Sequence, residues 1–389
     1  MSAGEQAPAS DAGTRVPAAG AGEQSARVSR LALELDALEL DALLVDSLVD
    51  VRYLSGFSGS HALVLAVAAG AHARLGGDRF LTDFRYASQS AAQVPDVFER
   101  EIIPGELLDA LAEALADGEG RLGFVEGSVS VKTHRRLGEL LGEGWELVPC
   151  DGVVARMRAV KDEREVARIR AACELADEAL RGLLEAGLVG RSEREVALEL
   201  EQRMRGLGAS GPSFSTIVAA GAHGALPHAE PRPREIPKDV LVTVDWGALL
   251  DGYCSDCTRT YATGEGISAQ ARETYELVLR AQQRGLDVLR AGPSGREVDA
   301  LAREVVEQAG QGEHFGHGLG HGVGMEVHEA PRLSRTASEE PLLAGNVVSV
   351  EPGVYLPGAL GVRIEELAVV REHGCEVLTG LPRELTVVD

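Results

Sequence analysis

The sequence has 389 residues, a hydrophobic content of 44% and a formal net charge of −23 at pH 7. Its length predicts two domains or more, and its acidity excludes a nucleic-acid partner, which requires a basic surface. No apolar run approaches the roughly 18 residues of a membrane span, so no membrane partner is expected.

Residues 1–26 are rich in Ala, Gly, Pro, Ser and Gln and contain one Val as their bulky core-forming residue. Such a composition cannot bury enough apolar surface to order itself. The segment also lacks the charged start and the apolar stretch of a signal peptide. We therefore expect a disordered tail over residues 1–26 and a cytoplasmic protein.

Helical and strand-like patterns alternate over residues 27–152. Residues 25–44 have apolar side chains at helical spacing and run into a buried-strand pattern. Residues 105–118 form an amphipathic helical pattern that ends at a glycine. Further strand patterns occupy residues 61–70 and 120–127. This alternation predicts an α/β domain over 27–152.

The remainder, residues 153–389, begins with helical patterns and then changes to short strands separated by Gly and Pro. Ser192 and Glu195 have the spacing of a capping box at a helix start. The helical patterns occupy residues 154–190, 192–208, 268–291 and 295–309. The mixture predicts an α+β second domain.

Asp245 and Asp256 lie on two strand-like runs joined by an Asp-Gly pair, a strong hairpin signal. With a four-residue loop, 249–252, Asp245 faces Asp256. With a two-residue loop, Asp245 faces Thr258, and Asp256 is the next residue on that face. Both registers put the two carboxylates on one face, because side chains alternate along a strand. A polar solvent face with ordinary turn aspartates explains this pair alone equally well.

Glu351 and Glu365 form a second pair of carboxylates. A turn centred on Gly358 makes them face each other, with Arg363 two residues before Glu365 on the same face. A cation there can orient the carboxylates or bind a developing anion. A surface Glu/Arg cross-strand pair is the alternative for this segment alone.

The glycine-rich run GHGLGHGVGMEVHEAP carries His317, His321 and His328. It is not a zincin helix, because the first His is not followed by Glu and glycine disfavours a helix. A phosphate-binding loop is disfavoured because no GK[ST] or GxGxxG pattern follows a strand. His228 lies between two prolines in a loop, where site residues often occur.

The potential metal ligands are four carboxylates and one imidazole: Asp245, Asp256, His321, Glu351 and Glu365. An oxygen-rich set with His suits a hard or borderline divalent ion such as Mn²⁺. Because four carboxylates carry more charge than one such ion needs, the set predicts two ions that share bridging carboxylates. Paired ions of this kind activate a water nucleophile.

The segments VDWGA and SDCTRT, GHGVGMEVHE, VEPGVY and VRIEE, in this order, resemble the metallopeptidase family of the pita-bread fold, which includes methionine aminopeptidase, aminopeptidase P and prolidase. The resemblance covers residues 27–389 and implies a pita-bread catalytic domain over 153–389. It also implies that the five residues above are ligands of two divalent ions, Mn²⁺ with Co²⁺ or Zn²⁺ as alternatives.

Carried over residue by residue, the resemblance implies further site residues. His228 corresponds to a substrate-contacting His, and His328 to the His at the scissile bond. His317 and the VRIE form with Arg363 resemble the proline-specific branch, and Glu351 corresponds to the ligand that transfers a proton. RYLSGFSGS and LTDFRYASQ resemble the N-terminal domain of creatinase and prolidase.

The resemblance implies an Xaa-Pro aminopeptidase or dipeptidase. Such an enzyme uses a metal-bridging hydroxide to hydrolyse the first bond of peptides with proline at the second position, and it is expected to be a homodimer. The alternative is a small-molecule C–N hydrolase or lyase on the same scaffold, like creatinase or ectoine hydrolase. The retained ligands favour a peptidase. A non-catalytic binding protein would be expected to have lost ligands, and none is lost.

Overall fold

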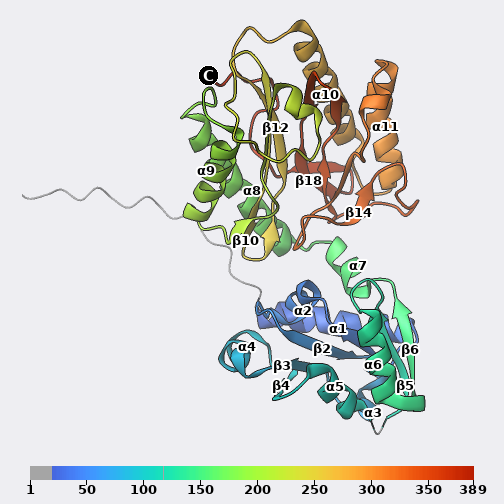
Figure 1. Cartoon of the computed structure of the whole chain (residues 1–389). Coiled ribbons are helices and arrows are strands. Elements are labelled where there is room, and N and C mark those ends of the chain that lie inside the picture. Colours follow the sequence, from blue (N-terminus) through green and yellow to red (C-terminus); the bar gives the residue numbers. More distant parts are fainter. Residues whose placement is uncertain (1–19, 117) are drawn as a thin grey trace, which may run out of the picture.

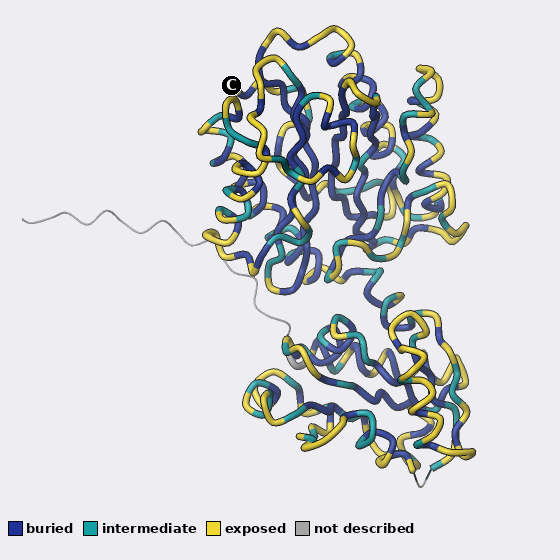
Figure 2. Tube along the Cα trace, viewed as in Figure 1, coloured by how far each residue is buried: buried dark blue, intermediate teal, exposed yellow. Residues whose placement is uncertain are grey.

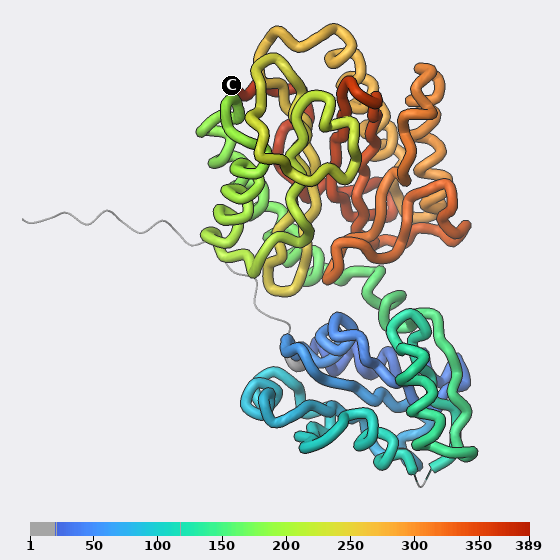
Figure 3. The backbone as a smooth tube through the Cα atoms, in the orientation of Figure 1, coloured from blue at the N-terminus to red at the C-terminus, as the bar shows by residue number. Residues whose placement is uncertain are grey.

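The structure is a computed structural model that describes residues 20–116 and 118–389. The chain forms two domains, with helix α7 (Val153–Ala159) between them (Figure 1). The chain completes the N-terminal domain before it enters the larger second domain, as the colours in Figure 3 show. In the described part of the chain, no helix is both long and apolar enough to cross a membrane.

The N-terminal domain is built on one mixed, six-stranded sheet with the order β4-β3-β2-β1-β5-β6. Its strands are β1 (Ala42–Val45), β2 (Ala62–Val67), β3 (Arg79–Thr82), β4 (Glu99–Ile102), β5 (Gly120–Val125) and β6 (Trp145–Cys150). Its helices are α1 (Ala21–Ala37), α2 (Leu48–Ser55), α3 (His72–Leu75), α4 (Ala87–Gln93), α5 (Leu107–Leu115) and α6 (Val131–Leu141). The predicted α/β class is confirmed.

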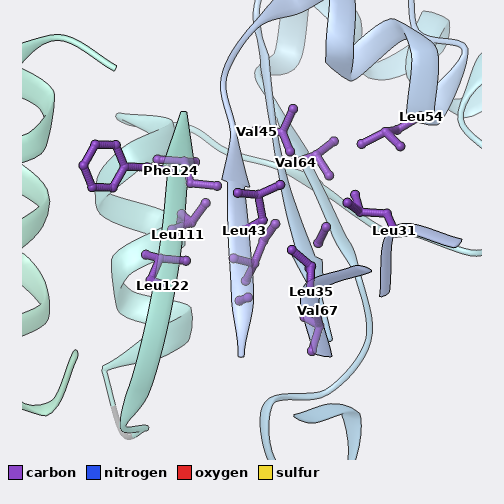
Figure 4. Packing of buried hydrophobic residues seen from close by; sticks show 14 of the residues in the cluster. Leu31, Leu35, Leu43, Val45, Leu54, Val64, Val67, Leu111, Leu122 and Phe124 are labelled. Atoms are coloured by element: carbon purple, nitrogen blue, oxygen red, sulfur yellow. The ribbon is translucent and has the colours of Figure 1, made fainter. Parts of the chain in front are cut away.

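The core of this domain lies between the sheet and its helices. Leu31 and Leu35, one helical turn apart on α1, belong to one buried cluster with Leu43 of β1 and Leu111 of α5 (Figure 4). Each of these side chains is completely buried. Full burial of a leucine contributes roughly 1.5–3 kcal/mol, so the spacing of apolar residues fixes which face of each helix meets the sheet.

The structure corrects the predicted end of the N-terminal tail, because α1 begins at Ala21 and not after residue 26. Glu23 is buried and forms ion pairs with Arg27, at 2.6 Å, and with Arg168 of the second domain, at 3.1 Å. The prediction from composition failed because ion pairs, and not apolar side chains, hold the first turn of α1 against the second domain. Residues 1–19 of the predicted tail lie outside the described residues.

A second correction concerns the boundary between the domains. The helical pattern predicted a second domain from residue 153 onward and one long helix over 154–190. Instead, α7 packs into the N-terminal core through Val153, Val154 and Met157. A separate helix, α8 (Glu163–Leu184), starts where the Asp162 side chain caps it, which ends the continuous pattern.

In the second domain, long helices lie around several antiparallel sheets. These helices are α8, α9 (Glu193–Gly206), α10 (Ala269–Val288) and α11 (Gly295–Gln308) (Figure 1). The predicted capping box of Ser192 and Glu195 is confirmed at the start of α9. Figure 2 shows that the strands are buried inside the domain, whereas exposed residues concentrate on loops and outer helix faces. The predicted α+β class is confirmed.

The first strands of this domain are β7 (Gly211–Pro212), β8 (Ile217–Ala220), β9 (Leu241–Trp246), β10 (Ala248–Leu250), β11 (Tyr253–Cys254) and β12 (Cys257–Ala262). The later strands are β13 (Gly320–Gly322), β14 (Glu329–Leu333), β15 (Val347–Val350), β16 (Gly353–Leu356), β17 (Leu360–Arg363), β18 (Glu366–Arg371) and β19 (Gly374–Val377). The two groups lie side by side, since β12 contacts both β17 and β18.

Candidate metal centre

The first hairpin adopts the two-residue-loop register of the two that the sequence allowed. Asp245 pairs with Thr258, and Leu250 pairs with Tyr253 across the Asp-Gly turn. Both turn residues have positive φ, 50° for Asp251 and 89° for the following glycine. A type I′ hairpin requires this conformation, which explains why an Asp-Gly pair stands here.

The second hairpin has the predicted register. β15 and β18 pair Val350 with Glu366, and β16 and β17 pair Gly353 with Arg363. Glu351 and Glu365 lie in the break between these two ladders. Their backbone N–H groups donate to the carbonyls of Leu319 and Thr258, at 2.8 and 3.1 Å. The break therefore joins the glutamates to the histidine strand and to the aspartate hairpin.

His321 lies on β13, and its ring orientation fixes which nitrogen is free. Its Nδ1 is 3.1 Å from the carbonyl oxygen of Gly322. Because a carbonyl only accepts, Nδ1 carries a hydrogen, and Nε2 is the ring atom directed at the carboxylates. Nε2 lies 3.2 Å from Glu351 Oε1 and 3.6 Å from Asp256 Oδ2. This arrangement is typical of a metal-ligating histidine.

The acidic side chains fit a bound cation. Ligand atoms of Asp256, His321 and Glu365 lie within 4.8 Å of one another. In the described residues, Asp245 Oδ1 and Glu365 Oε1 are buried without a hydrogen-bond partner. Burial, followed by the neighbouring carboxylates, raises the pKa of Asp256 and Glu365 well above their usual values. Divalent ions at this place would supply both the missing partners and the missing positive charge.

The pKa of Glu351 is shifted in the opposite direction from those of Asp256 and Glu365. Burial alone would raise its pKa, but the hydrogen bond and charge of His321 lower that pKa to about 2. The pKa of His321 is in turn raised, because the effect of Glu351 outweighs that of burial. The contact with His321 therefore favours the ionised form of Glu351 even without a metal.

Arg363 connects the two hairpins. Its Nη2 donates to Asp245 Oδ2 at 2.6 Å, and its Nε donates to Thr258 Oγ1 at 3.0 Å. The Thr258 hydroxyl donates to Glu365 Oε2 at 2.8 Å. Thr258 was not predicted to be a site residue, although its position opposite Asp245 in one of the two registers could have indicated that it lies beside the carboxylates.

A second contact of Arg363, through the Tyr355 hydroxyl, fixes which ring nitrogen of His317 carries the hydrogen. Its Nη1 donates to the Tyr355 hydroxyl at 2.9 Å, and that hydroxyl lies 2.9 Å from His317 Nε2. His317 Nδ1 is 2.8 Å from the carbonyl of Gly318, so Nδ1 donates and Nε2 accepts from Tyr355. Burial also lowers the pKa of His317, which keeps the ring neutral. Tyr355 was not among the site residues predicted from the sequence.

One cavity of about 440 Å³ brings the predicted site residues together. His228 and His328 are exposed and line it beside the acidic cluster, and the rings of His321 and His328 have centroids 4.3 Å apart. Phe214 and Ile217 give the cavity an apolar wall. The predicted site residues that line it are His228, Asp245, Asp256, His317, His321, His328, Glu351, Arg363 and Glu365.

The loop that carries His228 is attached to the start of α9 by one buried carboxylate. Glu193 accepts the backbone N–H groups of Ala220 and Arg232, which lie on the two sides of His228, each at 2.9 Å. It also contacts His223 Nδ1 at 2.9 Å. The loop is therefore fixed at both ends, and the histidine has a defined position relative to the cluster.

Comparisons with known proteins identify the family of each domain. Residues 167–372 match the model of Metallopeptidase family M24, and residues 27–160 match that of the Creatinase/Prolidase N-terminal domain. The chain is 41% identical over 345 residues to the uncharacterized peptidase YqhT of Bacillus subtilis, covering 88% of this chain and 94% of that protein. It is 42% identical over 240 residues to the Xaa-Pro dipeptidase of Pyrococcus furiosus, 62% of this chain and 68% of that one. A solved Xaa-Pro dipeptidase from Bacillus anthracis superposes with a TM-score of 0.86 at 37% identity, covering 95% of this chain and all 100% of the other.

Proposed function

The chain belongs to metallopeptidase family M24 and joins a creatinase/prolidase N-terminal domain to a pita-bread catalytic domain, and from this premise we propose that it is an Xaa-Pro peptidase. Its substrates would be peptides or dipeptides with proline at the second position. The observation that carries the proposal is the cavity in which the acidic cluster meets an apolar wall and the neutral His317. A proline ring needs such an uncharged, largely apolar pocket.

We assign Asp245, Asp256, His321, Glu351 and Glu365 to two divalent ions. The oxygen-rich donor set favours Mn²⁺ over softer ions. When bound, the ions would supply Lewis acidity and make a coordinated water acidic enough to ionise near neutral pH. The partnerless oxygens of two of these buried carboxylates support the assignment.

The protein's own groups have distinct tasks in the proposed reaction. Glu351 takes a proton from the attacking water and delivers it to the proline nitrogen as the C–N bond breaks. His328 donates a hydrogen bond to the carbonyl oxygen of the preceding residue, where negative charge develops. His228 and His317 line the pocket for the proline ring, and Arg363 holds the carboxylate of Asp245 in place.

The proposal is tested by assaying the purified protein, loaded with Mn²⁺, Co²⁺ or Zn²⁺ in turn, against Gly-Pro, Ala-Pro and an Arg-Pro-Pro peptide. We expect hydrolysis of the Xaa-Pro bond, with Ala-Ala cleaved at least about 100-fold more slowly, because it leaves the ring pocket empty. The ratio of dipeptide to longer-peptide rates separates a dipeptidase from an aminopeptidase. Hydrolysis of creatine without action on any Xaa-Pro peptide would identify the small-molecule alternative.

We also propose that the enzyme is a homodimer in which the N-terminal domain of one subunit overhangs the active site of the other. Phe84, whose surface is 77% exposed, is the large aromatic side chain of this domain that such a contact would cover. Sedimentation velocity at micromolar concentration is expected to give the mass of two chains. A monomer that retains full activity on Xaa-Pro substrates would contradict the shared site.

A further inference from the structure

Two buried basic residues at the domain junction hold the segment that contains His328. Arg158 and Lys161 are only 3% and 5% exposed. Nη2 of Arg158 lies 2.7 Å from a carboxylate oxygen of Glu326 and 2.7 Å from one of Glu329. The ammonium of Lys161 binds the other oxygen of Glu329. Since these glutamates stand two residues before and one residue after His328, both sides of the histidine are anchored.

The N-terminal domain completes this network. Nη1 of Arg158 donates to Asp50 Oδ1 at 2.7 Å, and Asp50 is a buried residue of α2. Met325 packs against both the N-terminal core and a core cluster of the second domain. Gly324 leaves room for the ion pair, because a Cβ atom there would lie 2.4 Å from Glu329 Oε1. The segment before His328 is therefore seated on the N-terminal domain of its own chain.

Moving one partner of this network would leave buried charges unpaired. Both cations and the carboxylates of Asp50 and Glu329 are buried, with side chains at most 6% exposed, and an unpaired buried charge is costly. Arg158 spans Asp50 on one side and both glutamates on the other, which its planar fork permits and a point charge does not. Moving α2 relative to the second domain would therefore move the glutamates, and the His328 backbone with them.

We propose that Asp50, Arg158 and Lys161 are positioning residues for His328, so that the N-terminal domain of each chain sets the geometry of that chain's own active site. This inference rests on the proposed peptidase activity, in which His328 contacts the carbonyl of the scissile bond. It differs from the overhang of a partner subunit, because every contact in the network lies within one chain.

The test is Asp50→Asn, which keeps the shape of the side chain and removes the charge that fixes Arg158. We expect kcat on Ala-Pro to fall about 10- to 100-fold, because a displacement of about 1 Å at a reacting group costs up to that much. KM should stay within about twofold and the metal content should not change, since no residue of the network itself lines the cavity or is a proposed ligand. A purely structural role would lower the melting temperature without this split.

The matched control is Glu23→Gln. Glu23 is also buried and also pairs across the domain junction, with Arg168 at 3.1 Å, but it contacts neither glutamate beside His328. Its kcat should remain within about twofold of the wild-type value. An equal fall in both variants would mean that general loosening of the junction is responsible, and that result would overturn the inference.

A double-mutant cycle gives the second criterion. In a His328→Ala background, Asp50→Asn should have little further effect on kcat, because the group through which it acts is gone. An equal fold-change in kcat in both backgrounds would overturn the inference.

If Asp50→Asn does not fold, Glu326→Gln replaces it, since the Glu326 side chain is 50% exposed and the loss of its charge is better tolerated. A wild-type enzyme inactive on every Xaa-Pro substrate would refute the proposed function instead.

Discussion

Asp256→Asn is expected to remove most of the activity and part of the metal. Wild-type protein dialysed after Mn²⁺ loading should retain about two equivalents per chain by elemental analysis, as paired-ion sites do. The variant should approach one or fewer, because an amide is a weaker and uncharged ligand. We expect kcat/KM to fall by more than the roughly 10- to 100-fold that losing a hydrogen-bond partner of a metal ligand costs, since Asp256 Oδ2 lies 3.6 Å from His321 Nε2 and is itself a proposed ligand.

The melting temperature gives a second, independent test of Asp256→Asn. Burial and Glu365 raise the pKa of Asp256, so its charge is a cost in the metal-free protein. Asn removes that cost, and the metal-free variant should melt no lower than metal-free wild type. Adding Mn²⁺ at about 100 times its dissociation constant from the wild type should stabilise the wild type by about 2.7 kcal/mol for each site that it fills, and the same Mn²⁺ concentration should stabilise the variant much less.

Asp251→Asn is the control for this experiment. It makes the same chemical change in the same hairpin, but at the exposed turn position, where φ is 50° and asparagine is well tolerated. It should keep both equivalents of Mn²⁺ and full activity. Two tightly bound equivalents and normal turnover in Asp256→Asn would refute its assignment as a ligand.

Turn chemistry explains why the carboxylate pairs could be predicted from the sequence. Gly358 at the centre of the second turn determines which residues face each other, and the observed pairing of Gly353 with Arg363 follows from it. For the first hairpin, alternation put Asp245 and Asp256 on one face in either register, but it could not choose between them. That choice depended on the positive φ of Asp251, which only the folded turn reveals.

Contacts between distant parts of the chain could not be predicted in this way. Asp50 and Arg158 are 108 positions apart, and Arg158 and Glu329 are 171 apart. Local periodicity and capping patterns report on neighbours within a few turns, so they carry no information about such pairs. For the same reason composition misjudged Glu23, whose burial depends on a partner in the second domain.

His328→Ala is expected to lower kcat by about 100- to 1000-fold, the usual effect of removing a donor to a developing oxyanion. Metal content should be unchanged, because the ring nitrogen that faces the carboxylates belongs to His321. KM should change much less than kcat, since the hydrogen bond strengthens only as charge develops on the carbonyl oxygen. Steady-state kinetics on Ala-Pro and elemental analysis of the same sample measure both quantities.

Two further variants make the His328 result specific. His328→Gln retains a hydrogen-bond donor, so it should recover part of the lost kcat if donation to the carbonyl is the function of the ring. His373→Ala removes an exposed histidine between β18 and β19 and should leave kcat unchanged. Loss of both metals from a correctly folded His328→Ala would instead show that this ring supports the ligands. Its contact with His321, at 4.3 Å between ring centroids, would then be the connection through which it acts.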